Sequence, residues 1–158
     1  MRIIIPGDPL TQLRMRFGRC GKFSKVFDPV KKEKDKIKAF LREKYGDFGF
    51  FEHPVVSFLF CMPIPASTSK KQRAMYLNRR VRQESKPDTD NLLKLYLDCM
   101  SGILFQDDNI VSIGMAIKIY HPEPKTIINI QESSRLFDAY EMKQFYERLF
   151  YEMDDLVD

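Results

Sequence analysis

Runs of apolar residues along the chain predict a set of short strands. Residues 2–5 predict a first strand, and residues 55–62 form an almost continuous apolar run. Such a run is typical of a central strand that is covered on both faces. Residues 110–120 and 126–130 are two further apolar segments separated by the proline-rich residues 121–124, and we expect them to form a hairpin.

The segment after the first strand predicts a second hairpin and then a helix. Residues 14–17 and 25–27 read as the arms of a hairpin around Gly18 and Gly21. Asp28 and Pro29 predict the helix start, because Asp is a favoured N-cap and Pro is favoured at the first helical position. The apolar stripe of this helix comprises Val30, Ile37, Phe40, Leu41 and Tyr45, and an adjacent basic face comprises Lys31, Lys38 and Arg42.

Two more helices complete the expected fold. Residues 69–72, Ser-Lys-Lys-Gln, have capping-box spacing and predict a short helix through about Leu77. Residues 137–153 have the pattern of an amphipathic helix, either part of the core or a dimer contact. The order of elements predicts one α+β domain with a small mixed sheet backed by helices. We expect a core over residues 1–131 and a C-terminal helical extension over 132–158, packed on the same domain.

One segment concentrates chemically useful side chains. Residues 86–94 read Lys-Pro-Asp-Thr-Asp-Asn-Leu-Leu-Lys, and Asp107 and Asp108 follow later. An extended start would place Asp88 and Asp90 on one face, and Asp90 or Asn91 would be the N-cap of a helix that ends near Gly102. In that helix Asp90, Lys94 and Asp98 share one stripe, while Leu92, Leu93, Tyr96 and Met100 pack it onto the core.

These side chains suit a magnesium-dependent phosphodiester hydrolase. Carboxylate oxygens are the ligands that Mg²⁺ prefers, so Asp88, Asp90 and Asp108 are the candidate metal ligands. Lys94 is the candidate catalytic lysine, because its positive charge would hold the scissile phosphate. The competing interpretation is an ordinary surface loop, a solvent-exposed lysine–carboxylate pair on a helix, and a turn at Asp107 and Asp108.

The charge distribution favours a polyanionic partner. Residues 1–86 contain 20 Lys and Arg against 8 Asp and Glu, a net charge of +12, whereas residues 87–158 contain 6 against 14, a net charge of −8. A basic half would capture the phosphate backbone, and part of the acidic half would hold the metal. Solvated lysine-rich surface is the alternative explanation. Residues 78–86 predict a basic loop that leads directly to the aspartates.

Other residue patterns exclude several classes of site. Cys20, Cys61 and Cys99 lack the paired spacing of zinc ligands and predict reduced, mostly buried thiols. His53 and His121 have no spaced partner, which disfavours histidine-based catalysis. No run of eighteen apolar residues and no secretory signal is present, so we expect a cytoplasmic protein without membrane association.

The segment around the aspartates resembles a known family. Residues 86–94, the following Asp98 and Gly102, and the run Asp107-Asp108-Asn109-Ile110 are similar to the signature of the RusA family of Holliday junction resolvases. The resemblance covers about residues 1–131. It implies a homodimeric endonuclease in which Asp88, Asp90 and Asp108 hold Mg²⁺, with Mn²⁺ as a substitute, and Lys94 assists catalysis. The implied substrate is branched DNA, foremost the four-way junction.

The resemblance leaves substrate choice and even catalysis open. The leading hypothesis is paired nicking of Holliday junctions in DNA recombination and repair. A nuclease for flaps or other replication intermediates would use the same residues, and a non-catalytic DNA- or RNA-binding module would use only the basic ones. The candidate nucleic-acid-binding residues are Arg14, Arg16, Lys70, Lys71, Arg79, Arg80, Arg82 and Lys86.

Overall fold

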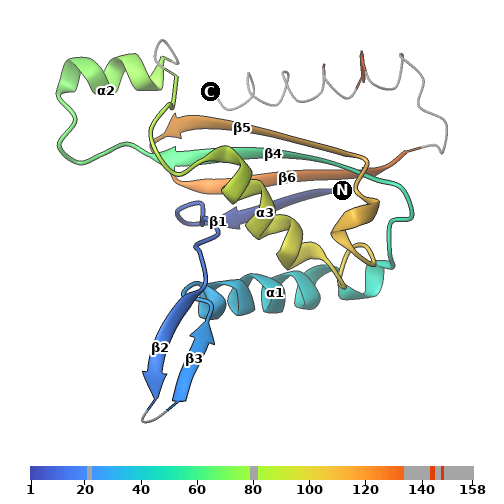
Figure 1. The fold of residues 1–158 in the computed structure, drawn as a ribbon. Helices are drawn as coiled ribbons and strands as arrows, with labels where there is room; N and C mark the ends of the chain where they lie inside the picture. The colour runs from blue at the N-terminus through green and yellow to red at the C-terminus, as the bar shows by residue number, and fades with distance from the viewer. Residues whose placement is uncertain (21–22, 79–81, 134–142, 145–146, 148–158) are drawn as a thin grey trace.

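Strands and helices alternate along the chain largely as the apolar pattern predicts. The computed structural model describes residues 1–20, 23–78, 82–133, 143–144 and 147 (Figure 1). In chain order the elements are β1 (Arg2–Pro6), β2 (Arg16–Cys20), β3 (Phe23–Phe27), α1 (Lys31–Tyr45), the 3-10 turn η1 (Gly46–Phe48), β4 (Pro54–Pro63), α2 (Lys70–Leu77), α3 (Thr89–Met100), the 3-10 turn η2 (Asp108–Ile110), β5 (Ile113–His121) and β6 (Lys125–Glu132). The α+β class with a mixed sheet is confirmed.

The sheet has the strand order β1-β6-β4-β5, with β4 at its interior. β4 runs parallel to β5 and antiparallel to β6, and all its residues from Pro54 to Met62 are buried. The prediction of a covered central strand is therefore confirmed. The predicted hairpin between β5 and β6 is wrong, because β4 lies between them and pairs with both. An apolar strand gains more from two neighbours than from an edge position, which favours this insertion.

The core lies mainly between the sheet and the helices. Alternate residues of β4, namely Val56, Phe58, Phe60 and Met62, join buried residues of α1 and α3 in one cluster, and α3 crosses this face of the sheet (Figure 1). Leu59 and Cys61 belong to a second, smaller cluster on the opposite face. The period of two along a strand separates the two sets. This packing fixes α3, which carries the candidate site, against the sheet.

Helix α1 begins later than its sequence signal predicts. Lys31 is its first residue and Val30 its N-cap, so Asp28 and Pro29 lie in the preceding turn. The Asp28 carboxylate accepts a hydrogen bond from the Val30 amide at 3.0 Å and thereby stabilises this turn. Asp28 is an effective capping residue, but it caps a turn before the helix. The predicted apolar stripe is confirmed, with Ile37 and Leu41 buried in the core.

Two other local signals act close to where they were expected. The Ser69 hydroxyl accepts a hydrogen bond from the Gln72 amide, which confirms the predicted start of α2 with Ser69 as its N-cap. Gly102 has a φ of +73° directly after Ser101, the C-cap of α3. Glycine adopts this left-handed conformation without a steric penalty, so it ends the helix as predicted.

The hairpin formed by β2 and β3 projects away from the sheet as an arm (Figure 1). Its strands are longer than predicted, and Gly18 lies inside β2, opposite Lys25, and not in the turn. The Phe27 ring covers Gly18 so closely that a Cβ there would lie 3.2 Å from it. Gly21, the other predicted turn residue, lies outside the described residues.

The C-terminal helix predicted over residues 137–153 also lies outside them, except that Lys143, Gln144 and Glu147 are helical. The division into a core over residues 1–131 and an extension over residues 132–158 stays a prediction. Of the helices that the structure describes, none combines the length and the apolar character needed to cross a membrane.

Candidate active site

The first two candidate ligands lie at the start of α3. Asp88 is the N-cap of this helix, and Asp90 lies in its first turn. The predicted N-cap at Asp90 or Asn91 is therefore wrong by two or three residues. The constraint from Pro87 acts on the residue before it, which leaves Thr89 free to begin the helix. Within the described part of the chain, neither carboxylate has a hydrogen bond or ion pair, and Asp88 makes no side-chain cap.

The predicted polar stripe along α3 is present. Asp90 and Lys94 are exposed and Asp98 is half-buried, one helical turn apart from each other. The buried residues of the helix are Leu92, Leu95, Tyr96, Cys99 and Met100. The packing of Leu92, Tyr96 and Met100 is confirmed, and Leu93 packs only partly buried against the core. The stripe is thus presented to solvent at Asp90 and Lys94 and is half-buried at Asp98.

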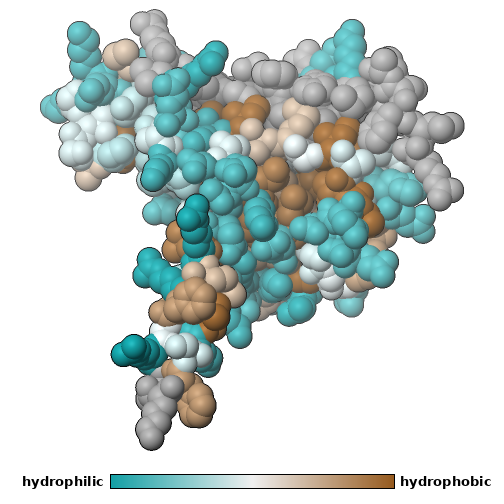
Figure 2. Space-filling model, viewed as in Figure 1, coloured by the Kyte–Doolittle hydropathy of each residue, from teal (hydrophilic) through white to brown (hydrophobic). Residues whose placement is uncertain are grey.

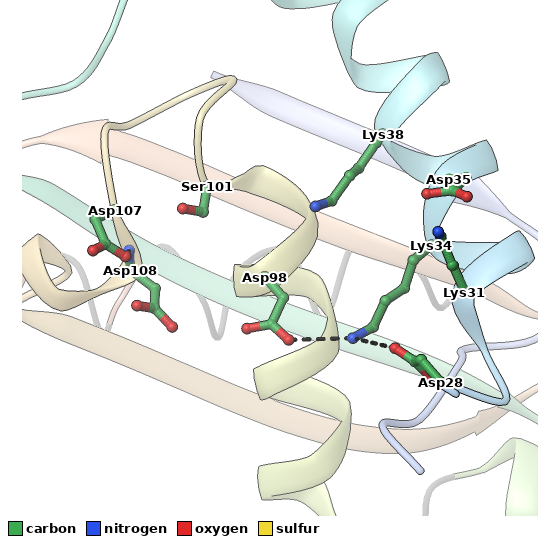
Figure 3. A pocket seen from close by; sticks show the side chains of 9 residues that line it. All are labelled: Asp28, Lys31, Lys34, Asp35, Lys38, Asp98, Ser101, Asp107 and Asp108. Carbon is green, nitrogen blue, oxygen red and sulfur yellow. Dashed lines mark hydrogen bonds and ion pairs between the residues drawn. The ribbon is translucent and has the colours of Figure 1, made fainter. Parts of the chain in front are cut away.

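A lysine from α1 joins this stripe through two ion pairs. The Lys34 ammonium lies 3.3 Å from a carboxylate oxygen of Asp98 and 3.2 Å from one of Asp28 (Figure 3). The hydrogen bond from the Val30 amide, followed by the hydrogen bond and charge of Lys34, lowers the pKa of Asp28. Sequence reasoning missed Lys34, although its spacing from Lys31 and Lys38 places it on the basic face of α1. This bridge connects the turn before α1 to the site helix.

Asp108 lies beside the same helix, on the turn η2. The strand predicted to open at Ile110 begins only at Ile113, because residues 108–110 form the 3-10 turn. The Asp107 carboxylate accepts a hydrogen bond from the Asp108 amide at 2.7 Å. Hydrogen bonding to the Asp107 side chain, burial, and the charges of Asp107 and Asp98 raise the pKa of Asp108, while the charge of Lys94 lowers it. Asp108 is therefore within electrostatic reach of the polar stripe.

A cavity of about 410 Å³ opens between α1 and these acidic groups (Figure 3). Lys31, Lys34, Asp35 and Lys38 line it from α1, and Asp98, Ser101, Asp107 and Asp108 line it from α3 and the following loop; Asp28 completes the lining. The mixture of lysines and carboxylates makes this a polar cavity. Asp88, Asp90 and Lys94 do not line it. Asp88 and Asp90 lie at the exposed start of α3, and Lys94 lies midway along the helix.

The loop before Asp88 is held by a second residue that the sequence reasoning missed. Lys118 on β5 donates hydrogen bonds to the carbonyl oxygens of Ser85, at 3.0 Å, and Pro87, at 2.8 Å. The neighbouring Tyr120 stacks on Tyr76 of α2, with ring centroids 4.1 Å apart. A lone charged residue within an otherwise apolar strand is the sequence signal that marks Lys118. Its contacts place the residue that directly precedes Asp88.

The comparison with protein families identifies the fold. Residues 6–131 match the model of the family described as endodeoxyribonuclease RusA. This match covers most of the chain. The chain belongs to the RusA family. The resemblance inferred from residues 86–110 is thereby confirmed.

One relative of this RusA family member is the uncharacterized protein YqaN of Bacillus subtilis (strain 168). The two are 33% identical over 73 residues, which are 46% of this chain and 51% of YqaN. The match thus spans about half the length of that relative. It supports the relationship without adding a biochemical activity.

Enzymes of the RusA family depend in general on divalent metal ions, and the residues of this chain fit such an ion by their chemistry. Asp88 and Asp90 offer carboxylates without a protein partner in the described region, and Asp108 adds one across the stripe. The three carboxylates are not grouped closely enough to coordinate one ion together. Among the described residues, no three His, Cys, Asp or Glu side chains are grouped so that they could hold an ion.

The candidate DNA-binding residues of this RusA family member occupy separate parts of the surface. Arg14 and Arg16 lie at the base of the arm, Lys70 and Lys71 in the first turn of α2, and Arg82 and Lys86 in the loop before Asp88; all six are exposed. Arg79 and Arg80 lie outside the described residues. Lys86 lies two residues before Asp88 in the sequence, and the path from basic residues to the aspartates stays a prediction.

Proposed function

We propose that this chain is a magnesium-dependent endodeoxyribonuclease that cleaves branched DNA, foremost Holliday junctions, in recombination and repair. Membership of the RusA family supports the reaction class. The observation that carries the proposal is the set of unpartnered charged groups at the start of α3. Asp88 and Asp90 have no hydrogen bond or ion pair to a described residue, and Lys94 follows one turn later without one. Groups left unpartnered in this way are available to a ligand.

We propose that Asp88, Asp90 and Asp108 would hold the Mg²⁺ ion, with Mn²⁺ as a substitute. When bound, the ion supplies polarisation of a phosphoryl oxygen and a water of lowered pKa. Asp90 lies in the first turn of α3, where the positive end of the helix dipole attracts negatively charged groups. Lys94 would place its ammonium against a phosphate oxygen and stabilise the negative charge that develops during cleavage. Its influence on the pKa of Asp108 is consistent with this role.

The remaining charges would bind and orient the substrate. Lys86 and Arg82 would contact phosphates of the strand that approaches Asp88, and Lys31 and Lys38 of α1, which line the cavity, would contact the flanking backbone. A two-fold homodimer would provide one site for each of the two strands that must be nicked. Sedimentation velocity tests the dimer directly. If the protein sediments as a monomer both when free and when bound to the junction, paired nicking by one symmetric enzyme is ruled out.

Cleavage assays with a labelled four-way junction and a linear duplex of the same sequence test the main proposal. In Mg²⁺ we expect cutting of the junction, loss of cutting in Asp90→Asn, and unchanged junction binding by that variant. Asp47→Asn is the matched control, because Asp47 is an exposed aspartate on η1 that does not line the cavity. Normal cutting by Asp90→Asn would refute the site.

The same assay separates the alternative functions. Equal cutting of junction and linear duplex would refute junction selectivity, whereas preferential cutting of flaps would indicate the replication-intermediate nuclease. If the unmodified protein binds DNA but does not cut in Mg²⁺ or Mn²⁺, the chain is a nucleic-acid-binding module. Loss of affinity with rising salt is expected in each case, because phosphate contacts release counterions.

A further inference from the structure

The arm formed by β2 and β3 exposes aromatic side chains to an unusual degree. Phe17 is 81% exposed and Phe23 is 80% exposed, and every residue of β3 is exposed. Figure 2 shows apolar side chains along the arm, interspersed with hydrophilic ones. A two-stranded hairpin has little stability of its own in water, and exposed rings of this size usually mark an interaction surface. The arm is therefore a candidate for binding a partner.

The charge of the arm indicates the chemistry of this partner. Residues 14–27 contain no Asp or Glu, and their cations are Arg14, Arg16, Arg19, Lys22 and Lys25. Residues directly opposite in an antiparallel pair share a face, so Phe17 shares one face with Val26. Arg16 and Phe27 share the other face. Because side chains alternate along each strand, Arg19 lies on the face of Phe17, and Phe23 lies on the face of Arg16. Each face thus combines an apolar ring with a cation, which matches a polyanion that also offers flat aromatic groups.

Both ends of the arm are attached to the helix that carries the candidate site. Before the arm, the Gln12 amide donates a hydrogen bond to the Asn91 carbonyl oxygen at 3.0 Å. After the arm, Asp28 is connected through Lys34 to Asp98 by ion pairs of 3.2 and 3.3 Å. These contacts fix the base of the arm relative to α3. A nucleic acid bound by the arm would therefore be held at a defined position relative to Asp90.

From these observations we infer that the arm binds DNA by stacking Phe17 and Phe23, which lie on opposite faces of the arm, on base faces left unstacked at a branch point, while its cations contact the adjacent phosphates. This inference rests on the proposed function and adds how the substrate is distinguished. In a continuous duplex the faces of the bases are covered by their neighbours, but at a junction or in a single strand they are accessible. Stacking on aromatic side chains then favours the branched substrate.

The test measures binding without cleavage, by fluorescence anisotropy in EDTA, with a four-way junction and a linear duplex. The variants are Phe17→Ala and Phe23→Ala. The matched control is Phe50→Ala, because Phe50 lies in the loop after η1 and its side chain is 56% exposed. We expect each arm variant to bind the junction about 5- to 100-fold more weakly, with little change on duplex and an unchanged salt slope. The control should bind like the unmodified protein.

A spectroscopic readout identifies stacking directly. With 2-aminopurine at the branch point, the unmodified protein should quench the fluorescence, and the arm variants should lose this quenching. Arm variants that bind and quench like Phe50→Ala would overturn the inference. A change from dimer to monomer in the arm variants, with quenching retained, would also overturn the inference, because it would assign the arm to contact with a second copy of the chain. Binding of the arm to anionic vesicles in place of DNA would overturn it as well.

The outcomes also separate this inference from the proposed function. Junction-selective cutting in Mg²⁺ together with normal binding by the arm variants would refute the arm and leave the nuclease intact. Loss of junction binding by the arm variants of a protein that never cuts would refute the nuclease and leave the arm intact. Thermal unfolding is expected to be unchanged, because the removed side chains are exposed.

Discussion

Replacement of Lys118 by methionine tests whether β5 positions the loop that leads to Asp88. Methionine keeps an unbranched apolar chain and removes only the ammonium, which donates hydrogen bonds to the carbonyl oxygens of Ser85 and Pro87 at 3.0 and 2.8 Å. A hydrogen bond from a charged donor contributes about 1.5–3 kcal/mol. Water can replace the donor at Ser85, which is exposed, but less readily at the partly buried contact to Pro87. We therefore expect a net effect of one such bond and not of two.

Loss of this hydrogen-bond energy favours displaced conformations of the loop over the conformation that positions Asp88. Since about 1.4 kcal/mol corresponds to a factor of ten, we expect the rate of junction nicking in Mg²⁺ to fall by up to about 100-fold. Hydrogen exchange measured by mass spectrometry should become faster in residues 82–88, independently of activity. The free energy of unfolding in urea should change less, because the loop can be released without unfolding the core.

Lys36→Met is the control for loss of a positive charge. Lys36 is an exposed residue of α1 without a hydrogen bond or ion pair in the described region. It should leave both the exchange and the nicking rate close to those of the unmodified protein. Equal exchange and equal nicking in Lys118→Met and the unmodified protein would refute the positioning role. Slower nicking with unchanged exchange would place the effect of Lys118 on DNA binding instead.

Three further predictions concern the core and the site helix. Tyr96→Phe removes the hydroxyl that accepts hydrogen bonds from the Leu10 amide at 3.2 Å and the Thr126 hydroxyl at 2.9 Å, so urea denaturation should show a loss of about 1–3 kcal/mol; an unchanged midpoint would contradict this. Burial raises the pKa of the Cys99 thiol to about 11, so Ellman's reagent at pH 8 should modify it only after unfolding. The pKa of Asp28 lies below its ordinary value of 3.8, so its stabilising effect is present above that pH and lost as the pH falls further; the difference in stability between the unmodified protein and Asp28→Asn should therefore shrink in acid.

Local features of the fold could be predicted from the sequence because their causes lie within a few residues. The Ser69 cap depends on Gln72 three positions later, and the end of α3 depends on the conformational freedom of Gly102. The stripe from Asp90 to Asp98 follows from the helical repeat. Where a boundary moved, as at the start of α1, the same capping residue acted in a turn instead of the helix. Such shifts of two residues result from small differences in free energy between competing local hydrogen bonds.

Long-range pairing could not be predicted in the same way. The insertion of β4 between β5 and β6 pairs it with strands that begin about fifty residues later in the chain. The short connection at residues 122–124 gives the local signal of a hairpin whether or not this insertion occurs. Strand order is decided by packing of the whole sheet and not by neighbouring residues.

The composition of the candidate site divides along the same line. Asp88, Asp90, Lys94 and Asp108 were proposed from one segment of sequence, and this segment lies within the residues that match the family. Lys34 and Lys118 enter through contacts between distant elements, α1 with α3 and β5 with the loop before Asp88. The sequence by itself determined which chemical groups are present and on which helix face they lie. Only the tertiary structure decided which cations neutralise, hold and surround them, because Coulomb and hydrogen-bond energies depend on distances that folding creates.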